Sequence, residues 1–288
     1  MERLRKELIH DVLEVFGLSL INQFSSSTES ETAIRQLLKV DALRRKVVQV
    51  RLEKALKLGR IRTMEFNPLG MIVTKSGKNA IEHNLEGLAG DLSSARSARL
   101  IKPLSCLEVI KPLAINQRPD SMLNDIEIET PLKVLCVGPR NEAEPLILWA
   151  YGFKLEDITC VDLISYSEMV TLGDMHSLQY ADSTFDVVFS SCTLVYSRNI
   201  DRAAKELKRV AKPGAIFAIS QDIPNREYRN ESKSLYHREL CTPESIVELF
   251  YAIEEVEILY RHFVESNLDL PNGCTSACIF RNRWLANV

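Results

Sequence analysis

The chain has 288 residues, of which 45% are hydrophobic and 26% charged. This is the usage of ordinary globular proteins, and it excludes disorder along the whole length. At about 150 residues per domain, the length predicts two domains, or one domain with a large extension. The net charge of −3, from 36 basic and 39 acidic residues, argues against a protein that coats nucleic acid with its whole surface, although it allows a local basic patch.

No apolar stretch reaches the ~18 residues that a membrane-spanning helix needs. Charges are scattered through residues 1–20, so this segment lacks the apolar core of a signal peptide. We therefore expect a cytoplasmic protein that makes no membrane contact. The seven cysteines are odd in number and irregular in spacing, which favours free thiols over disulfides. Cys274 and Cys278 have no second Cys or His pair nearby, so we expect no metal site.

Apolar residues at helical spacing predict two helical segments at the start of the chain, over 1–24 and over 31–59. The second segment overlaps a basic stripe over 39–62, in which Asp41 and Glu53 are the acidic residues. Three interpretations of this stripe stay open: a solvated helix face, a groove for an acidic substrate, or a contact with RNA. The RNA interpretation is the weakest, because the stripe has little aromatic interleaving and single-stranded RNA is held partly by stacking.

The next part of the chain is harder to assign. Residues 61–80 carry two turn signals around a short apolar run, which predicts a hairpin or an irregular connection. Helices are predicted over 79–89 and over 93–110, with Pro103 starting or kinking the second. The segment 115–131 is polar and marked by proline, which indicates a boundary.

We therefore divide the chain into a mainly helical N-terminal region, 1–130, and a second domain, 131–288. The predicted N-terminal helices are amphipathic, and an isolated pair of them would expose its apolar face. We expect these helices either to close over the substrate side of a site in the second domain or to form the contact of a homodimer.

Short apolar runs alternate with helical patterns after Pro131, which predicts a mostly parallel α/β sheet covered on both faces. Seven strands are predicted, over 131–138, 157–163, 169–172, 185–191, 215–220, 256–264 and 274–284. The last two read as an antiparallel pair, so the sheet should carry an antiparallel last strand.

Helices are predicted between these strands from their capping and stop signals. One covers 142–153 and is closed by Gly152, and another covers 200–212 and is stopped by Pro213 and Gly214. A third begins at Pro243, the preferred place for a proline, with Thr242 as its cap.

Four predicted strands end in groups that suit a nucleoside-like ligand, and ligands of open α/β sheets bind at the carboxyl ends of the strands. Gly138 follows the first strand, where a glycine lets the backbone approach a ligand. Asp162 ends the second and can accept hydrogen bonds from both hydroxyls of a ribose. Asp174 follows the third and can accept one from an adenine amine, with Met175 against the ring. Ser191 ends the fourth strand, whose backbone would line the reactive end.

At this point the sequence resembles the class I S-adenosylmethionine (SAM)-dependent methyltransferases, over about 131–284. The motifs VLCVGPRNE, ITCVDL, LGDMHSLQYADSTFDVVFSS and AAKELKRVAKPGAIFAIS carry the resemblance, and the last two are the most specific. The resemblance implies a Rossmann-like sheet, SAM as cofactor and methyl transfer as the reaction. It also implies cofactor contacts from Gly138, Pro139, Arg140, Asn141, Asp162, Leu163, Asp174, Met175, His176 and Ser191.

The sequence departs from the family pattern around the first strand. The usual glycine-rich loop is reduced to Gly138, and Cys136 stands where an acidic residue is common. Arg140 offers a charge partner for the cofactor's carboxylate. The order GPRNE, YGF and DLISYS looks like a bacterial branch of the family, an association that makes the tailoring of saccharides or other small molecules plausible.

We expect methyl transfer to the oxygen or nitrogen of a small-molecule or saccharide acceptor. One alternative is an RNA methyltransferase with 1–130 as its RNA module, which salt-sensitive RNA binding would indicate. The other is a catalytically silent scaffold with the methyltransferase fold, which the reduced glycine loop keeps open and which direct SAM binding would test.

A hydroxyl acceptor benefits from a general base. The polar segment 221–240 lies where the family places substrate loops, and His237 is the leading candidate base within it. A solvated loop histidine is the competing interpretation. Further candidates are Tyr196, Asp222 and Glu239.

Overall fold

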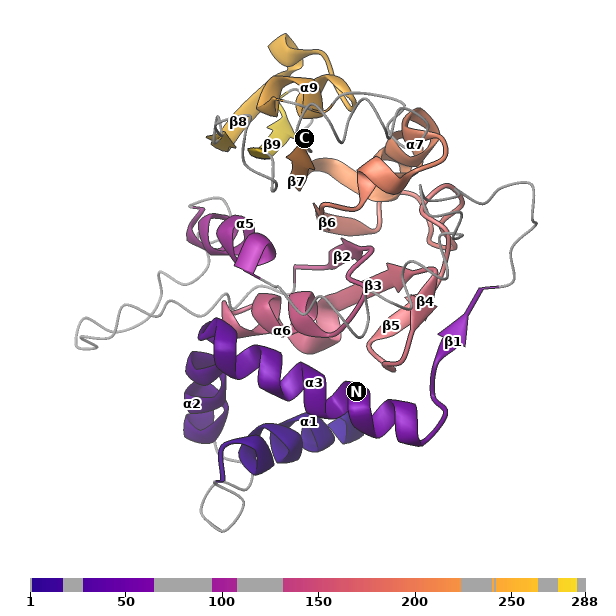
Figure 1. Ribbon diagram of the computed structural model, residues 1–288. Helices are drawn as coiled ribbons and strands as arrows, with labels where there is room; N and C mark the ends of the chain where they lie inside the picture. Colours follow the sequence, from indigo (N-terminus) through magenta and orange to yellow (C-terminus); the bar gives the residue numbers. More distant parts are fainter. Residues whose placement is uncertain are drawn as a thin grey trace, which may run out of the picture.

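The computed structural model describes residues 2–17, 28–64, 95–107, 132–223, 240, 242–263 and 274–283. A seven-stranded sheet lies at the centre of these residues (Figure 1). In spatial order its strands are β5 (Val170–Leu172), β3 (Ile158–Asp162), β2 (Val134–Val137), β6 (Phe185–Ser191), β7 (Ala211–Ile223), β9 (Cys274–Asn282) and β8 (Val256–Phe263).

The pairing confirms the predicted fold class. Strands β5, β3, β2, β6 and β7 pair in parallel, whereas β9 is antiparallel to β7 on one side and to β8 on the other. The result is an α/β fold with a mostly parallel sheet, an antiparallel strand near one edge, and helices in the N-terminal region.

The strands read as continuous apolar runs because helices cover both faces of the sheet. All four residues of β2 are buried, and they alternate between two hydrophobic clusters, with Val134 and Cys136 in one and Leu135 and Val137 in the other. The second cluster includes α7 (Ile200–Val210) and α9 (Pro243–Glu248). The predicted cap of α9 is confirmed, since Thr242 and Ser245 form a capping box.

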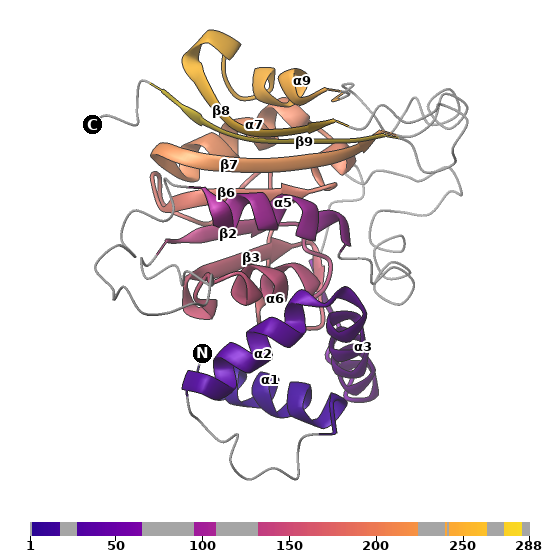
Figure 2. The ribbon, with the colours of Figure 1, turned by 90° about the vertical axis from the view of Figure 1, so that its left-hand side faces the viewer.

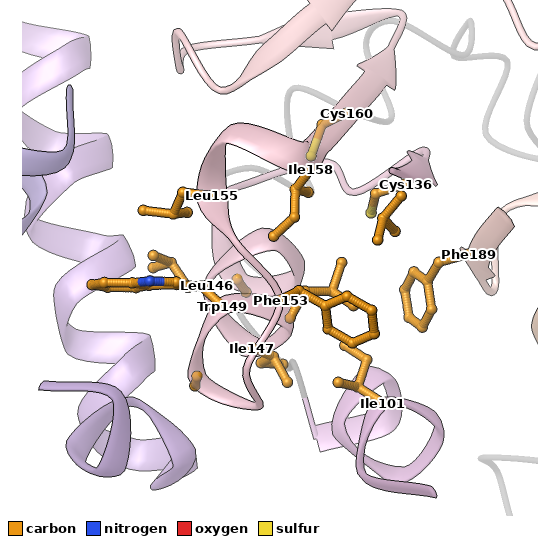
Figure 3. Packing of buried hydrophobic residues seen from close by; sticks show 14 of the residues in the cluster. Ile101, Cys136, Leu146, Ile147, Trp149, Phe153, Leu155, Ile158, Cys160 and Phe189 are labelled. Atoms are coloured by element: carbon orange, nitrogen blue, oxygen red, sulfur yellow. The ribbon is translucent and has the colours of Figure 1, made fainter. Parts of the chain in front are cut away.

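The first cluster lies under α5 (Ala95–Cys106) and α6 (Ala143–Ala150), which cross the near face of the sheet in Figure 2. Figure 3 shows Phe153 and Ile101 pointing toward Phe189 of β6. Every residue of α6 is buried. A helix that is buried all round needs cover on its outer side as well as on the side that faces the sheet.

The N-terminal helices provide that cover. They are α1 (Glu2–Val15), α2 (Thr28–Lys39) and α3 (Asp41–Lys57), and α2 and α3 both contact α6. Most of their buried apolar residues belong to the same cluster as Trp149 of α6, whose indole nitrogen donates to Glu31 of α2 at 3.2 Å. The amphipathic pattern of these helices is therefore accounted for within one chain, and it gives no separate support to the homodimer.

The predicted helix over 31–59 is two helices that break at Val40, which has an extended backbone. The side chain of Arg44 fills this corner, fully buried, and donates to the Leu38 carbonyl at 2.5 Å and to Asp41 at 2.7 Å. The apolar period runs through the break, so the pattern alone did not reveal it. The first helix ends at Val15 in the structure, earlier than predicted.

Pro213 and Gly214 were predicted to stop a helix before the fifth strand, and this is wrong in detail. Helix α7 ends at Val210, and both residues lie inside β7. The register with β6 shifts between Phe185 and Val187, and such an irregularity accommodates a proline because it releases the backbone from the regular ladder.

Several sequence-based predictions fall wholly or mostly outside the described residues: the hairpin or irregular connection over 61–80, described only as far as residue 64, the helix over 79–89 and the boundary segment 115–131. The division of the chain near residue 130 stays a prediction. Within the part of the chain that the structure describes, no helix combines the length and the apolar character that crossing a bilayer requires.

Candidate functional site

The loop after β2 has a shape that only glycine allows at Gly138. Its φ of +69° lies in the left-handed region, and an added Cβ would overlap the side chain of Thr193, which follows β6. The Thr193 hydroxyl donates toward the Gly138 carbonyl at 3.2 Å and the Ser191 carbonyl at 3.1 Å. The loops that follow β2 and β6 are therefore in direct contact.

Asp162, at the end of β3, connects the loop after β2 to β3 through hydrogen bonds. Its carboxylate is 8% exposed and accepts hydrogen bonds from the backbone nitrogen of Arg140 at 2.8 Å and of Leu163 at 2.6 Å. Burial raises the pKa of Asp162, although the backbone donors of Arg140, Leu163 and Ile164 act against that rise. Arg140 has a positive φ of 57°, unusual for a side chain with a Cβ, and the bond to Asp162 holds it there.

Pro139 and Asn141 complete the loop. The Asn141 backbone nitrogen donates to the Pro139 carbonyl at 2.5 Å, and the buried Asn141 side chain accepts from the Ala143 nitrogen at 2.9 Å. Because its side-chain oxygen caps the start of α6, Asn141 serves the shape of the loop.

Asp174 follows β5 and is linked to Asp162 through the backbone, since the Gly173 nitrogen donates to the Asp162 carbonyl at 2.9 Å. One Asp174 oxygen accepts from the His176 backbone nitrogen at 2.9 Å and lies 2.5 Å from His176 Nδ1. The other accepts from Arg198 at 2.6 Å. Burial would raise the pKa of Asp174, but the hydrogen bonds from His176 and Arg198 outweigh it and hold the pKa well below its ordinary value.

His176 is 4% exposed and lies between two partners, with its Nε2 atom 2.6 Å from the hydroxyl of the buried Ser197. The structure thus places His176 behind Asp174, where it orients the carboxylate. Met175 is partly buried and packs against the apolar cluster on this face of the sheet.

The structure describes some of the remaining candidate residues and leaves others undescribed. Ser191 is buried at the end of β6, 3.0 Å from the Ser220 hydroxyl of β7. Tyr196 follows β6 and is 41% exposed. His237, Glu239 and the side chain of Asp222 lie outside the described residues.

Sequence reasoning missed a group of buried polar side chains near the ends of β6 and β7, on the face of the sheet opposite to the Ser191 side chain. Within the described part of the chain, the side-chain polar atoms of Ser190, Gln221 and Ser276 are buried and have no hydrogen-bond partner. Gln221 pairs with Ser276, and Ser190 pairs with Ile219. Because side chains alternate along a strand, the three polar side chains share one face of the sheet. Only the strand register reveals this group.

Four cations of the basic stripe over 39–62 are paired with carboxylates of the N-terminal region. Arg44 and Arg45 contact Asp41, Arg51 contacts Asp11, and Lys54 contacts Asp11 and Glu14. These carboxylates come from α1 and from α3 itself. The pairing leaves less free positive charge for RNA or for an acidic substrate than the sequence indicated.

Known proteins resemble the sheet region. Residues 136–219 match the family model of a methyltransferase domain. A sterol 4-C-methyltransferase of Caenorhabditis elegans is 34% identical over 67 residues, 23% of this chain and 20% of that protein. A biotin biosynthesis bifunctional protein of Teredinibacter turnerae is 45% identical over 49 residues, 17% of this chain and 9% of that protein. The aligned segments thus span a fifth or less of these relatives' own length.

Among solved structures, the N-methyltransferase NodS of Bradyrhizobium japonicum, in complex with S-adenosyl-L-homocysteine, is 13% identical with a TM-score of 0.41, over 52% of this chain and 77% of that chain. That likeness is too remote to extend to residues or substrates. The family match begins inside β2 and ends inside β7, so it spans the strands that carry Gly138, Asp162 and Asp174. This chain therefore contains a SAM-dependent methyltransferase domain of class I.

Proposed function

We propose that the protein transfers a methyl group from SAM to a small-molecule or saccharide acceptor, at an oxygen or a nitrogen. The observation that carries the proposal is the joined pair of strand-end carboxylates: Asp162 and Asp174 end neighbouring strands and are linked through Gly173. The family match over the same strands supports it.

The residues present fit SAM. Each oxygen of a carboxylate can accept two hydrogen bonds. The Asp162 carboxylate already accepts from the backbone nitrogens of Arg140, Leu163 and Ile164, so capacity for a ribose hydroxyl remains. The Asp174 oxygen that faces Arg198 can likewise accept the adenine amine as a second donor.

When bound, SAM supplies the activated methyl group, and the transfer is an in-line displacement for which the protein mainly positions the reactants and excludes water. Asp162 and Leu163 would hold the ribose, and Asp174, Met175 and His176 the adenine side. The loop from Gly138 to Asn141 would hold the methionine part, and Ser191 would border the reactive end.

A polar acceptor matches the carboxyl ends of β6 and β7. Ser190, Gln221 and Ser276 offer buried donors and acceptors there. An apolar acceptor such as a sterol would leave them without partners, at a cost of about 1–3 kcal/mol for each group. A saccharide or another hydroxyl-rich molecule would satisfy them, which supports the saccharide or small-molecule class over the sterols of the curated relatives.

Two competing functions have simple tests. An RNA methyltransferase would bind RNA at low salt and lose that binding as salt is added, whereas the ion pairs of the basic stripe predict weaker RNA binding than its sequence indicates. A silent scaffold would fail to bind SAM in a calorimeter. The acceptor itself can be sought by screening polar small molecules for release of S-adenosylhomocysteine.

Asp162→Ala should weaken SAM binding about 30-fold to 150-fold, or about 2–3 kcal/mol, because the ribose loses a charged acceptor. Isothermal titration calorimetry measures the change. Asp157→Ala is the matched control, since Asp157 precedes the opposite end of the same strand and should leave affinity unchanged. Unchanged affinity in a folded Asp162→Ala protein would remove Asp162 from the site.

Asp174→Asn should weaken SAM binding and cost stability at neutral pH, because the amide presents one oxygen and turns an NH₂ group toward His176 or Arg198. The folded-state pKa of Asp174 is depressed, so its stabilisation is present above the unfolded pKa, near 3.9, and is lost as the pH falls through the folded value. The difference in Tm between wild type and variant should therefore shrink as the pH drops below about 4. Asp182→Asn, at an exposed carboxylate, is the control; a Tm difference independent of pH would contradict the assignment.

Gln221→Leu should raise the acceptor KM about tenfold and leave SAM affinity unchanged, because only the acceptor would lose a hydrogen-bond partner. The variant should be at least as stable as wild type, since it removes a buried polar group that lacks a partner within the described residues. Initial rates with the acceptor found in the screen, together with the Tm, test both statements. An unchanged KM would exclude Gln221 from the acceptor site.

His237→Ala should lower turnover about 10²-fold to 10⁴-fold if His237 is the general base for a hydroxyl acceptor, with SAM affinity unchanged. A neutral amine acceptor would lose little, because its lone pair is already free. Tyr196→Phe is a useful comparison, since it removes the hydroxyl of another candidate base, which follows β6. If His237→Ala turned over a hydroxyl acceptor at the wild-type rate, His237 would be excluded as the general base.

A further inference from the structure

A buried ion pair joins the N-terminal helices to the loop after β2. Arg51, in the middle of α3, contacts Glu142 through two atoms, with Nε 2.5 Å from one carboxylate oxygen and Nη2 3.0 Å from the other. The side chains of Arg51 and Glu142 are 10% and 1% exposed. Glu142 directly follows the loop from Gly138 to Asn141 and precedes α6.

Further groups converge on this pair. Arg51 also contacts Asp11 of α1, and the Ser167 hydroxyl donates to Glu142. The backbone nitrogen of Glu142 donates to the Tyr166 hydroxyl at 3.4 Å. Burial alone would lower the pKa of Arg51, but Glu142 and Asp11 outweigh burial and raise it, so the guanidinium stays charged.

A second attachment lies beside Asp162. Strand β1 (Arg62–Thr63) follows α3 and pairs antiparallel with β4 (Ile164–Ser165), as Figure 1 shows. The Met64 nitrogen donates to the Leu163 carbonyl at 2.9 Å. Arg62 donates to the carbonyls of Ser167 at 2.6 Å and of Val170 at 3.0 Å. The N-terminal region therefore contacts the segments that follow both β2 and β3.

Stability does not explain an ion pair at this place. Removing two charges from water costs several kcal/mol, and apolar residues of similar volume often stabilise a protein as well or better. What a bidentate pair adds is direction, because the planar guanidinium fits a carboxylate in few orientations. Such a pair fixes the position of the backbone that carries Glu142.

The loop needs an external constraint of this kind. It contains one glycine, and Arg140 keeps a left-handed backbone with a side chain present, which costs about 1–2 kcal/mol. Its conformation must therefore be held by contacts on both sides. Asp162 holds it at Arg140, and Arg51 holds it at Glu142.

We propose that Arg51 is a positioning residue for the cofactor, which acts through Glu142 to fix the loop from Gly138 to Asn141, and that the N-terminal helices are thereby part of the SAM site. This inference rests on the proposed function. It assigns α1 and α3 to the cofactor side of the site, whereas the sequence had predicted either a cover over the acceptor side or a homodimer contact.

Arg51→Met and Glu142→Gln in the full chain should each weaken SAM binding about 10-fold to 100-fold, the size of effect that a misplaced contact produces. Leu38→Ala is the matched control, because Leu38 is buried in α2 within the cluster that includes α6. It should lower the Tm as much as the charge variants while leaving SAM affinity unchanged. Equal losses of affinity in all three variants would show that affinity follows stability alone and would overturn the proposal.

A double variant, Arg51→Met with Glu142→Met, provides the second test. Because it removes both charges together, it should recover the Tm that either single variant loses. Its SAM affinity should stay reduced, since no directional contact remains. Recovery of affinity together with the Tm would overturn the proposal.

Hydrogen exchange separates a failure of this inference from a failure of the proposed function. Without any ligand, Arg51→Met should speed exchange at the amides of Arg140 and Ala143 relative to Leu38→Ala, because those amides report the shape of the loop. If the wild-type protein bound no SAM, the proposed function would be refuted. The exchange rates would still test whether Arg51 fixes the conformation of the loop. Unchanged exchange at both amides in Arg51→Met would overturn the inference by itself.

Discussion

The carboxylate of Asp162 connects the three strand ends that make up the site. The carboxylate accepts a hydrogen bond from the backbone nitrogen of Arg140 in the loop after β2, while the backbone carbonyl of Asp162 accepts one from the nitrogen of Gly173 after β5. Burying this group is costly, as its raised pKa shows. The cost is acceptable because backbone donors surround the carboxylate, and a buried polar group that is hydrogen-bonded need not destabilise the fold. The same hydrogen bonds hold the strand ends in one arrangement, ready for a ligand that spans them.

The burial of α6 on all sides determines how the N-terminal helices pack against the sheet region. A helix with Leu146, Ile147, Leu148 and Trp149 in succession cannot present a polar face to water. The N-terminal helices supply its outer cover, so the hydrophobic cluster crosses the division that was expected near residue 130. The sheet region and the helices that precede it therefore share one core.

The features that sequence could predict are those with a local pattern. The strand over 185–191 was placed correctly because a buried strand is a continuous apolar run, and Asp162 and Asp174 were found because they follow such runs. The cap at Thr242 has its own local signal. The break at Val40 does not, since the apolar period continues through it. The pairing of β1 with β4 joins two-residue strands too short for any period.

Ion pairs between distant residues could not be predicted from the sequence, because they too have no local pattern. Arg51 was one cation among many in a basic stripe, and nothing near Glu142 in the sequence indicates a partner in α3. His176 likewise gains its role as the support of Asp174 from Ser197, which a different strand and turn bring within 2.6 Å. These contacts depend on the assembled fold, so structure is needed to tell a solvated charge from a buried one.

The reduced glycine content of the loop after β2 explains why these distant contacts are needed. Glycine adopts a left-handed backbone at no steric cost, whereas Arg140 requires compensation. In this chain the compensation comes from outside the loop: from Asp162 on one side and from Glu142, held by α3, on the other. A loop that cannot hold its own conformation depends on the elements packed around it, and this dependence makes the N-terminal helices part of the site.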